Sequence, residues 1–358
     1  MTTPPATDRW ESTTTLDEIA AWLAPARSVL VLTHAKPDGD AIGSAIGLVR
    51  ALRLAARSVG KDPATIRARF VGPVPRWLKA VADSDEYDHL DARPLTDDNP
   101  DALVVVDTGS RSQLEAAADF VAARADRNAI IDHHLDGDPT LAARRVLDFK
   151  ASAASVTIAD LCRRILGLAS VADLPQPIAQ VLYLGVASDT GWFRHSNVDP
   201  RTMHTAADLL EASADHGALY TLSEQQQRES RLRLLGRVLT NMRLLCDGQL
   251  AIMPVSALDK TETGVLPGES SGFADLALTI ETVRVAVVIT EVENADPPTC
   301  KLSLRSKAGP DRVNVNEVAR GFGGGGHAQA SGARSEGTID QIADRLEAAV
   351  GEALRARA

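Results

Sequence analysis

Residues 128–134 read NAIIDHH, an apolar run that ends in Asp132, His133 and His134. Three other apolar runs in the first two hundred residues also end in side chains that bind metals. They are SVLVLTHAKPDGD (residues 28–40), ALVVVDTGS (residues 102–110) and LYLGVASDTG (residues 182–191), which supply His34, Asp38, Asp40, Asp107 and Asp189. Short apolar runs bounded by turn residues are typical of strands that are buried on both faces. All four runs are therefore predicted to be strands.

The order of the patterns predicts how these strands are arranged. From residue 28 to residue 189, apolar runs alternate with helical patterns over residues 42–54, 113–124 and 153–166. This alternation predicts an α/β domain with a doubly wound parallel sheet. Ligands of such sheets gather beyond the carboxyl ends of the strands. We therefore expect the carboxylates and imidazoles to converge in one crevice.

A change of pattern marks the second half of the chain. Helical periodicity continues through residues 202–211, and residues 223–245 are predicted to form one long charged helix that connects two domains. Beyond it QLAIMPV, VRVAVVITEV and CKLSLRS are predicted strands, followed by a glycine run and a last helix over residues 339–354. The predicted parts are a disordered tail (1–15), a larger α/β domain (16–215), a helical linker (216–245) and a smaller α/β domain (246–358).

Length and composition exclude several classes of protein. The chain has 358 residues, and none of its stretches approaches the roughly 20 apolar residues of a membrane span. The N-terminus lacks the basic start and apolar core of a signal peptide, and Cys162, Cys246 and Cys300 lack the spacing of a metal site. These features predict a cytoplasmic protein. The net charge of −10 argues against a long groove for duplex nucleic acid but leaves room for a short phosphate ligand.

The mixture of carboxylates and imidazoles predicts a site for divalent cations. It suits Mn²⁺, while Mg²⁺, Co²⁺, Fe²⁺ and Zn²⁺ stay open because geometry and availability decide among them. The ligands are too many for one ion. Asp107 is placed to bridge two cations, which together would clamp the attacking and leaving oxygens of a phosphoryl displacement. Each motif alone has a plainer explanation as a helix cap or a turn, but four such endings in order favour the metal site.

The glycine run GFGGGGHAQASG (residues 321–332) is a second candidate site. It lacks the Lys-Ser/Thr pair of a P-loop and the strand–turn–helix context of a dinucleotide motif. Consecutive glycines, here Gly324, Gly325 and Gly326, let backbone N–H groups approach a phosphate closely. The HAQA segment is expected to begin a helix whose N-terminus faces the anion. A flexible turn is the alternative.

Basic residues near both candidate sites are expected to contact the substrate. Arg305 ends a predicted strand, and its guanidinium is suited to hold a phosphate through two hydrogen bonds. His327 is expected to bond a phosphate or stack on a base. Arg194 and His195 follow Asp189, and a solvated surface side chain is the alternative for Arg194. The substrate is expected to lie in a cleft between the two domains.

The chain resembles the DHH phosphoesterase superfamily, with THAKPDGDAIGS, VVVDTGS, IIDHH and GVASDTGWFR as its successive motifs. Its second half, with KLSLRS and GFGGGGHAQASG, resembles the DHHA1 domain. It is most similar to the stand-alone oligoribonucleases (nanoRNases) and pAp phosphatases, some of which cleave linear or cyclic adenine dinucleotides. The resemblance implies a Mn²⁺-dependent homodimeric hydrolase of pAp or RNAs of about two to five nucleotides, with water activated by two metal ions. The negative charge of the chain predicts weaker activity on longer strands.

The resemblance also implies a role for each residue of the acidic cluster. His34 and Asp38 would bind one cation, Asp40, His133 and Asp189 would bind the other, and Asp107 would bridge them. Asp132 would orient an imidazole. His134 is either a packed, hydrogen-bonded histidine or a group that contacts the scissile phosphate and assists the leaving oxygen, and the resemblance favours the second. The segment ASAASVTIADL departs from the Ser/Thr-rich start that this helix has in the family, so the roles of Ser152 and Ser155 stay open.

Other functions stay open from the sequence. A phosphodiesterase for cyclic-di-AMP or its linear form pApA would be identified by comparing turnover of cyclic and linear substrates. An inorganic pyrophosphatase would not need Arg305 or the glycine run. A nucleotide sensor without catalysis would show no turnover in saturating Mn²⁺.

Overall fold

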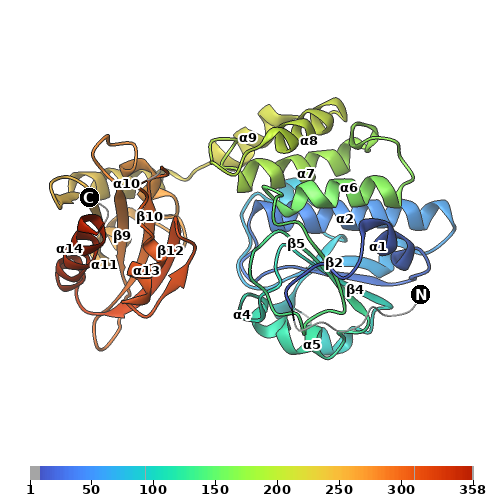
Figure 1. Ribbon diagram of the computed structural model, residues 1–358, viewed down its shortest axis with the longest axis horizontal. Helices are drawn as coiled ribbons and strands as arrows, with labels where there is room; N and C mark the ends of the chain where they lie inside the picture. Colours follow the sequence, from blue (N-terminus) through green and yellow to red (C-terminus); the bar gives the residue numbers. More distant parts are fainter. Residues whose placement is uncertain (1–8, 93, 310, 357–358) are drawn as a thin grey trace. The chain divides into compact units, whose positions relative to one another are not determined.

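The computed structural model describes residues 9–92, 94–309 and 311–356 (Figure 1). The chain separates into two compact units, and the boundary falls after Gln225. Each unit contains one six-stranded sheet. Among the helices in these ranges, none combines the length and the apolar character that a membrane crossing requires.

The first unit is built on the predicted parallel sheet. Its strand order, β3-β2-β1-β4-β5-β6, is typical of doubly wound α/β folds. Three of the four apolar runs form strands at the centre of this sheet, namely β1, β4 and β5. The strands are β1 (Val29–Leu32), β2 (Ile66–Phe70), β3 (Tyr87–His89), β4 (Ala102–Val106), β5 (Asn128–Asp132) and β6 (Arg144–Leu147).

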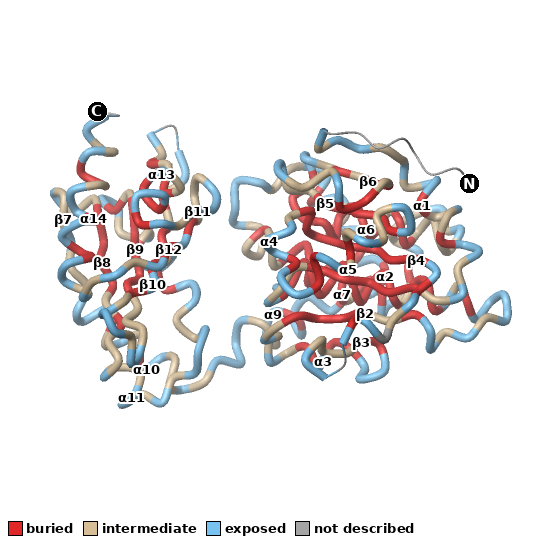
Figure 2. Tube along the Cα trace, turned by 90° about the horizontal axis from the view of Figure 1, so that it is seen from below, coloured by how far each residue is buried: buried red, intermediate tan, exposed pale blue. Residues whose placement is uncertain are grey.

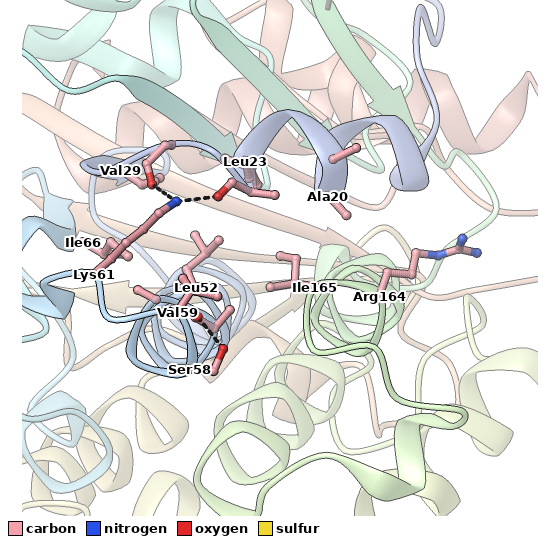
Figure 3. Close-up of a pocket in the computed structure, with 15 residues that line it drawn as sticks. Ala20, Leu23, Val29, Leu52, Ser58, Val59, Lys61, Ile66, Arg164 and Ile165 are labelled. Carbon is pink, nitrogen blue, oxygen red and sulfur yellow. Dashed lines mark hydrogen bonds between the residues drawn. The ribbon is translucent and has the colours of Figure 1, made fainter.

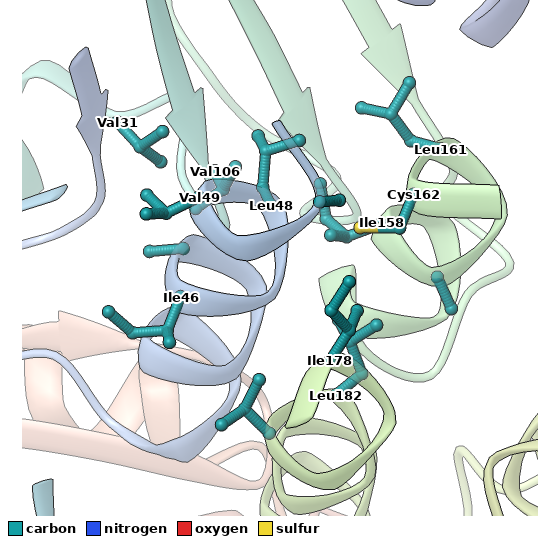
Figure 4. Close-up of a cluster of buried hydrophobic side chains, with 14 of the residues drawn as sticks. Val31, Ile46, Leu48, Val49, Val106, Ile158, Leu161, Cys162, Ile178 and Leu182 are labelled. Atoms are coloured by element: carbon teal, nitrogen blue, oxygen red, sulfur yellow. The ribbon is translucent and has the colours of Figure 1, made fainter. Parts of the chain in front are cut away.

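Helices cover both faces of this sheet because successive strand residues point into two different cores. Val31 and Val106 share one core with side chains of α2, α6 and α7 (Figure 4), whereas Leu30 and Leu103 share the other core with side chains of α4 and α5. The central strands β1, β4 and β5 are consequently buried along their whole length, as the red segments of β4 and β5 in Figure 2 show. The helices of this unit are α1 (Leu16–Leu23), α2 (Gly39–Ser58), α3 (Leu78–Val81), α4 (Arg111–Leu114), α5 (Ala118–Ala122), α6 (Ala154–Ile165), α7 (Gln176–Asp189), α8 (Pro200–Glu211) and α9 (His216–Glu224), with short 3₁₀ turns at η1 (Pro63–Thr65), η2 (Leu90–Ala92), η3 (Leu95–Asp97), η4 (Glu115–Ala117) and η5 (Val171–Asp173).

The fourth apolar run, LYLGVASDTG, is not a strand. Its first eight residues complete α7, which ends at Asp189, so the strand prediction is wrong. Every residue from 181 to 187 is buried, and a helix that is buried on all sides lacks the polar positions that would reveal its period.

Close packing between α2 and α7 brings Asp189 to the same place as the strand ends. Gly39 and Gly43 of α2 lie so near α7 that a Cβ at Gly39 would be 2.4 Å from the Cβ of Ser188, and one at Gly43 would be 2.4 Å from the carbonyl oxygen of Val181. The first turn of α2 therefore meets the last turn of α7.

Several helix predictions need correction at their ends. The α2 helix begins at Gly39 rather than near residue 42, because the Asp38 side chain accepts hydrogen bonds from the N–H groups of Asp40 and Ala41. The helix predicted over residues 113–124 is divided into α4, η4 and α5, since Glu115 has a positive φ of 45°. The helices predicted over residues 153–166, 202–211 and 339–354 are present as α6, α8 and α14.

The chain before α1 is attached to the sheet from residue 9 onward. Thr13 donates its N–H to the carbonyl of Arg145 at 2.9 Å, and Leu147 donates its N–H to Ser12 Oγ at 2.8 Å. Residues 9–15 thus run beside β6 rather than forming the predicted disordered tail, because their polar groups pair with those of an edge strand. Residues 1–8 of that predicted tail lie outside the described residues.

The single long helix predicted over residues 223–245 is also wrong. The segment contains the end of α9, a non-helical stretch, α10 (Glu229–Thr240) and β7 (Arg243–Leu245). Cys246, Asp247 and Gly248 all have positive φ and turn the chain from β7 into β8, which pairs with it. This turn removes the last residues of the segment from any helix.

The second unit contains a mixed sheet in the order β11-β12-β10-β9-β8-β7. The three predicted strands are present as β8, β9 and β10. The remaining bounds are β8 (Leu250–Val255), α11 (Ala257–Thr263), α12 (Phe273–Ala277), β9 (Val285–Glu291), β10 (Thr299–Ser306), α13 (Val315–Arg320), β11 (Gly325–Gly326), β12 (Ala330–Glu336) and α14 (Ile339–Arg355). One face of the sheet packs against α13 and α14, and the other packs against α10 and α12.

Candidate active site

The polar residues that follow β1, β4 and β5 meet the end of α7 at one edge of the first sheet. Parallel pairing places Leu32 beside Val105 and Val106 beside Ile131, so the residues after these strands emerge together. The candidate metal ligands form groups whose ligand atoms lie within 4.8 Å of one another. The groups are His34, Asp38 and Asp107; Asp40, His133 and Asp189; and Asp107, Asp132, His133 and His134.

The first group is centred on His34. Its Nε2 lies 3.8 Å from Asp38 Oδ1 and 3.5 Å from Asp107 Oδ2. The same oxygen of Asp38 caps α2, so the plainer explanation of this residue as a helix cap also holds.

The second group is centred on His133. Its Nε2 lies 3.3 Å from Asp107 Oδ1, 3.7 Å from Asp189 Oδ2 and 4.0 Å from Asp40 Oδ2. Asp107 therefore faces His34 with one oxygen and His133 with the other. Its φ of 61° belongs to the left-handed region, which aspartate tolerates better than most residues.

Both histidines present the same ring nitrogen to the carboxylates. Nδ1 of His34 lies 2.9 Å from the carbonyl oxygen of Ala35, and Nδ1 of His133 lies 3.1 Å from that of Ala151. With Nδ1–H donating to these carbonyls, the lone pair of each neutral ring is on Nε2, the arrangement that histidine ligands of metals commonly have.

The protein alone compensates the charge of Asp107 but not that of its neighbours. Burial acts to raise the pKa of Asp107, but hydrogen bonds from His133 and His34 lower it to about 2. Burial and the nearby Asp107 and Asp189 raise the pKa of Asp40 well above its usual range. Burial also raises the pKa of Asp189 to about 6, although His133 opposes the change.

Divalent cations fit this donor set. Asp38, Asp40, Asp107 and Asp189 would carry four negative charges in a region where Asp40 and Asp107 are 1% and 3% exposed. Two divalent cations would supply four positive charges, and unpaired buried carboxylates are costly. Carboxylate oxygens and imidazole nitrogens are the ligands that such ions take.

Asp40 is held in place by the start of α6, which lies more than one hundred residues later in the sequence. The N–H groups of Ala154 and Ser155 donate to its two carboxylate oxygens at 2.6 and 2.9 Å, and Ser44 Oγ donates at 3.3 Å. Asp40 thus occupies the position of a side-chain cap for α6, whose own N-cap residue is Ala153. The sequence analysis missed this contact. A helix that begins at an alanine, which cannot cap it, is the signal that could have suggested it.

The two serines whose roles stayed open lie around this contact. Ser155 Oγ hydrogen bonds with Ser44 Oγ at 2.9 Å, and Ser152 Oγ accepts from Thr202 Oγ1 at 2.8 Å. Both support the start of α6. Asn197, which the sequence analysis did not single out, donates to the carbonyls of Ser152 and Asp189 and connects that helix start to the end of α7.

Asp132 and His134 form a separate pair beside the cluster. Asp132 Oδ1 accepts from the N–H groups of His133 and His134 and lies 2.7 Å from His134 Nδ1. Burial acts to lower the pKa of His134, but the bond to Asp132 raises it above the usual value. The pair can hold a proton on the ring of His134.

Arg194 and His195 lie in the loop after α7 and are exposed. Arg194 Nε donates to the carbonyl of Gly191 at 2.7 Å, and the His195 ring packs over the same glycine. The loop therefore carries two basic side chains close in sequence to Asp189.

The glycine run in the second unit forms a hairpin and not a helix start. Gly325 and Gly326 pair with Gly332 and Ser331, and the N–H of His327 donates to the carbonyl of Ala330 at 2.8 Å. A Cβ at Gly324 would lie 2.1 Å from the carbonyl oxygen of Gly332. The helix expected after the run is absent from residues 327–336, because this close backbone pairing continues the chain as β12.

Arg305 lies on β10, where it pairs with Ala330 of β12. Its side chain is 34% exposed, and Nε lies 3.8 Å from Asp275 Oδ1. Gly325, Gly326 and His327 are also exposed. Backbone at Gly325, Gly326 and His327 and part of the Arg305 side chain are thus open to solvent, whereas the cleft expected between the two domains stays a prediction.

A cavity of about 380 Å³ lies elsewhere in the first unit, at the amino ends of β1 and β2 (Figure 3). Its wall is mostly apolar, and Lys61 Nζ at its edge donates to the carbonyls of Ala24 and Ala26. It lacks the carboxylates and imidazoles described above, so its size does not make it the site of the chemistry.

Comparisons with known proteins agree with this geometry. Residues 28–186 match the family model described as DHH family, N-terminal domain, and residues 247–355 match that of the DHHA1 domain. The chain is 31% identical to the bifunctional oligoribonuclease and PAP phosphatase NrnA of Thermus thermophilus, over 91% of this chain and 90% of that protein. It is 24% identical to the cyclic-di-AMP phosphodiesterase GdpP of Geobacillus thermodenitrificans, over 92% of this chain and 48% of that protein. The crystal structure of an exopolyphosphatase-related protein from Bacteroides fragilis superposes with a TM-score of 0.85 and 26% identity, over 95% of this chain and 96% of that one.

Proposed function

The chain belongs to the DHH family of metal-dependent phosphoesterases, and from that premise we propose that it hydrolyses very short RNAs and pAp to nucleoside monophosphates. The observation that carries the proposal is the position of Asp107. One of its oxygens faces His34 and the other faces His133, and each histidine lies near at least one further carboxylate. This arrangement suits two cations that share one carboxylate. A pair of cations is well suited to displacement at phosphorus.

We assign the cation ligands to the two groups described above. His34 and Asp38 would hold one cation, Asp40, His133 and Asp189 would hold the other, and Asp107 would be shared by both. Mn²⁺ is the proposed ion, with Mg²⁺ and Co²⁺ as substitutes. When bound, the cations polarise the scissile phosphate and activate water.

His134 is proposed to serve the leaving group. Asp132 accepts from its Nδ1, which fixes the orientation of the ring and favours the imidazolium. An imidazolium beside the scissile phosphate can donate a proton to the oxygen that leaves. The alternative, a histidine that only packs, predicts little loss of turnover when the ring is removed.

The second unit is proposed to hold the far end of the nucleotide. The partly exposed Arg305 and the exposed Gly325, Gly326 and His327 are groups that can bind a phosphate through guanidinium and backbone N–H donors. Arg194 and His195 are proposed to contribute from the first unit. The choice of a short nucleotide as the ligand is supported by the relative that is named for oligoribonuclease and PAP phosphatase activity.

A second candidate function is hydrolysis of cyclic-di-AMP or pApA. It is favoured by the similarity to the cyclic-di-AMP phosphodiesterase, although this chain spans about half of that protein. The same metal groups would serve both reactions, so only the substrate distinguishes them.

The experiment that tests the function is a comparison of substrates with Mn²⁺ present. Purified protein is assayed on a dinucleotide, a pentanucleotide, a 24-nucleotide RNA, pAp, pApA, cyclic-di-AMP and pyrophosphate, with Asp40→Asn as the inactive control. We expect the highest kcat/KM on pAp or the shortest RNAs. Faster turnover of cyclic-di-AMP would establish the second candidate, and turnover of pyrophosphate alone or of nothing would contradict both.

The proposal also includes a cytoplasmic location and a homodimer. Free Cys162, Cys246 and Cys300 support a reducing compartment. The dimer follows from the resemblance and is checked by light scattering of the full chain.

A further inference from the structure

The segment that precedes α1 reaches the candidate active site. This segment, residues 9–15, is called the N-terminal strap below. Arg145, which is 1% exposed, donates to the carbonyls of Glu11 at 3.2 Å and Arg9 at 3.3 Å. Ser12 and Thr13 bond to the neighbouring strand residues of β6. The strap is therefore fixed on both sides of Trp10.

Trp10 contacts two loops that carry proposed active-site residues. Its Nε1 donates to the backbone carbonyl of His134 at 3.1 Å. Its ring lies against Gly109, two residues after Asp107, and against Gly137, three residues after His134. The loops also bond to each other, since the N–H of Asp138 donates to the carbonyl of Gly109 at 2.8 Å.

The two glycines provide space for the ring. A Cβ at Gly109 would lie 1.8 Å from Trp10 Cη2, and one at Gly137 would lie 2.4 Å from Cε2. Neither glycine has a positive φ, so backbone conformation does not require glycine at either position. The indole occupies a slot that any larger residue at these two positions would close.

We infer that Trp10 is a positioning residue for His134. The inference rests on the proposed function, because it assumes that His134 acts on the leaving group. The hydrogen bond fixes the carbonyl of His134, and the ring holds the loop of His134 against the loop of Asp107. Since errors of about 1 Å in the placement of a reacting group can reduce turnover about 100-fold, loss of this contact should lower kcat more than it raises KM.

Two substitutions of Trp10 separate the hydrogen bond from the packing. Trp10→Phe keeps a ring but removes the donor, and Trp10→Ala removes both. We expect kcat on pAp to fall several-fold in Trp10→Phe and about 10- to 100-fold in Trp10→Ala, with KM changed less than about threefold. Trp22→Phe is the matched control, because Trp22 lies on α1, where its ring stacks on Arg144. A merely structural role would lower the yield of folded protein without this division between kcat and KM.

A double-mutant cycle tests whether Trp10 acts through His134. In a His134→Ala background, Trp10→Ala should lower kcat less than about twofold further, since the group that it positions is already gone. Equal losses in both backgrounds would overturn the inference.

Two measurements do not depend on turnover. Hydrogen exchange of the full-length protein without added metal should become faster in residues 107–110 and 133–138 of Trp10→Ala, while the strands keep their protection. In addition, Gly137→Ala should lower the melting temperature in the wild type but have little effect in Trp10→Ala, where the slot has space for the added methyl group. Unchanged exchange, or the same effect of Gly137→Ala in both backgrounds, would contradict the slot. Failure of the proposed function would instead appear as an inactive wild type with these two results preserved.

Discussion

The strand edge of the first unit and the glycine hairpin of the second unit hold their polar groups in opposite ways. At the strand edge, Asp107 is 3% exposed, and both its oxygens and those of Asp40 are fixed by neighbours in the same unit. Around the hairpin, Arg305 of β10 is 34% exposed, and Gly325, Gly326 and His327 are exposed. A buried, crowded set of carboxylates is stable only with compensating positive charge, whereas exposed backbone and guanidinium groups need none.

The difference indicates a division of labour. Fixed, buried ligands suit chemistry, because they need no rearrangement when the transition state forms. Exposed groups suit recognition, since their loss weakens binding without removing a reacting group. Changes at the strand edge should therefore alter kcat on every substrate, and changes at the hairpin should alter KM and selectivity.

The largest effect is expected from Asp40. Asp40→Ala or Asp40→Asn should lower kcat by about 1000-fold or more on every substrate, because the substitution removes a proposed cation ligand. Turnover of pAp and of a dinucleotide is the measurement. Asp40 also caps α6, so melting of Asp40→Asn, which keeps an acceptor oxygen, is the control for folding. If the variant keeps its activity on any one substrate, the proposal that the first unit carries out the hydrolysis of every substrate is wrong.

A second prediction concerns protons at the strand edge. Burial opposes the protonated rings, but contact with the carboxylates raises the pKa of His34 to about 11 and that of His133 to about 10. Both rings of the metal-free protein are then protonated at pH 7, and a cation must displace both protons. Affinity for Mn²⁺ should rise with pH by roughly 100-fold per unit between pH 7 and pH 9 and level off above the two pKa values.

Calorimetry in two buffers of different ionisation enthalpy counts the protons that are released. About two protons per chain are expected at pH 7 on saturation with Mn²⁺. His204→Ala is the control, because His204 is an exposed residue of α8. This variant should release the same number of protons as the wild type. If the wild type releases none, the cation does not displace the imidazole protons and the ligand assignment fails.

The smallest effect is expected at the hairpin. Arg305→Ala should raise KM for pAp and short RNA about tenfold and leave kcat within about twofold, because the guanidinium is proposed to bind a phosphate that does not react. Arg233→Ala is the matched control, since Arg233 is exposed on α10 and pairs with Glu229. An equal loss of kcat on all substrates with unchanged metal content would show that the two regions are not separable.

Sequence patterns predicted the parallel sheet and the convergence of its polar ends, because buried strands and parallel order both leave clear signals. They failed for the run before Asp189, since α7 is buried on all sides and its helical period is hidden. The broken helix over residues 223–245 depended on a turn at Cys246–Gly248 that hydrophobic periodicity does not report.

The residue types of the candidate site could be predicted from the sequence, but the contacts that hold these residues in place could not. The sequence indicated Asp40, yet its contacts with Ala154 and Ser155 join residues more than one hundred positions apart. Trp10 appeared to belong to a disordered tail, because a single tryptophan before the first helix has no periodic signal. Such contacts depend on tertiary packing, which determines distances that local patterns do not contain.

The number of cations bound per chain tests the central claim most directly. Metal analysis after equilibrium dialysis in saturating Mn²⁺ should give two ions per wild-type chain. Asp107→Ala should lose both, because the bridging carboxylate binds each ion and also screens the repulsion between them. One ion or none in the wild type, or an Asp107→Ala variant that retains two, would contradict the shared two-cation site.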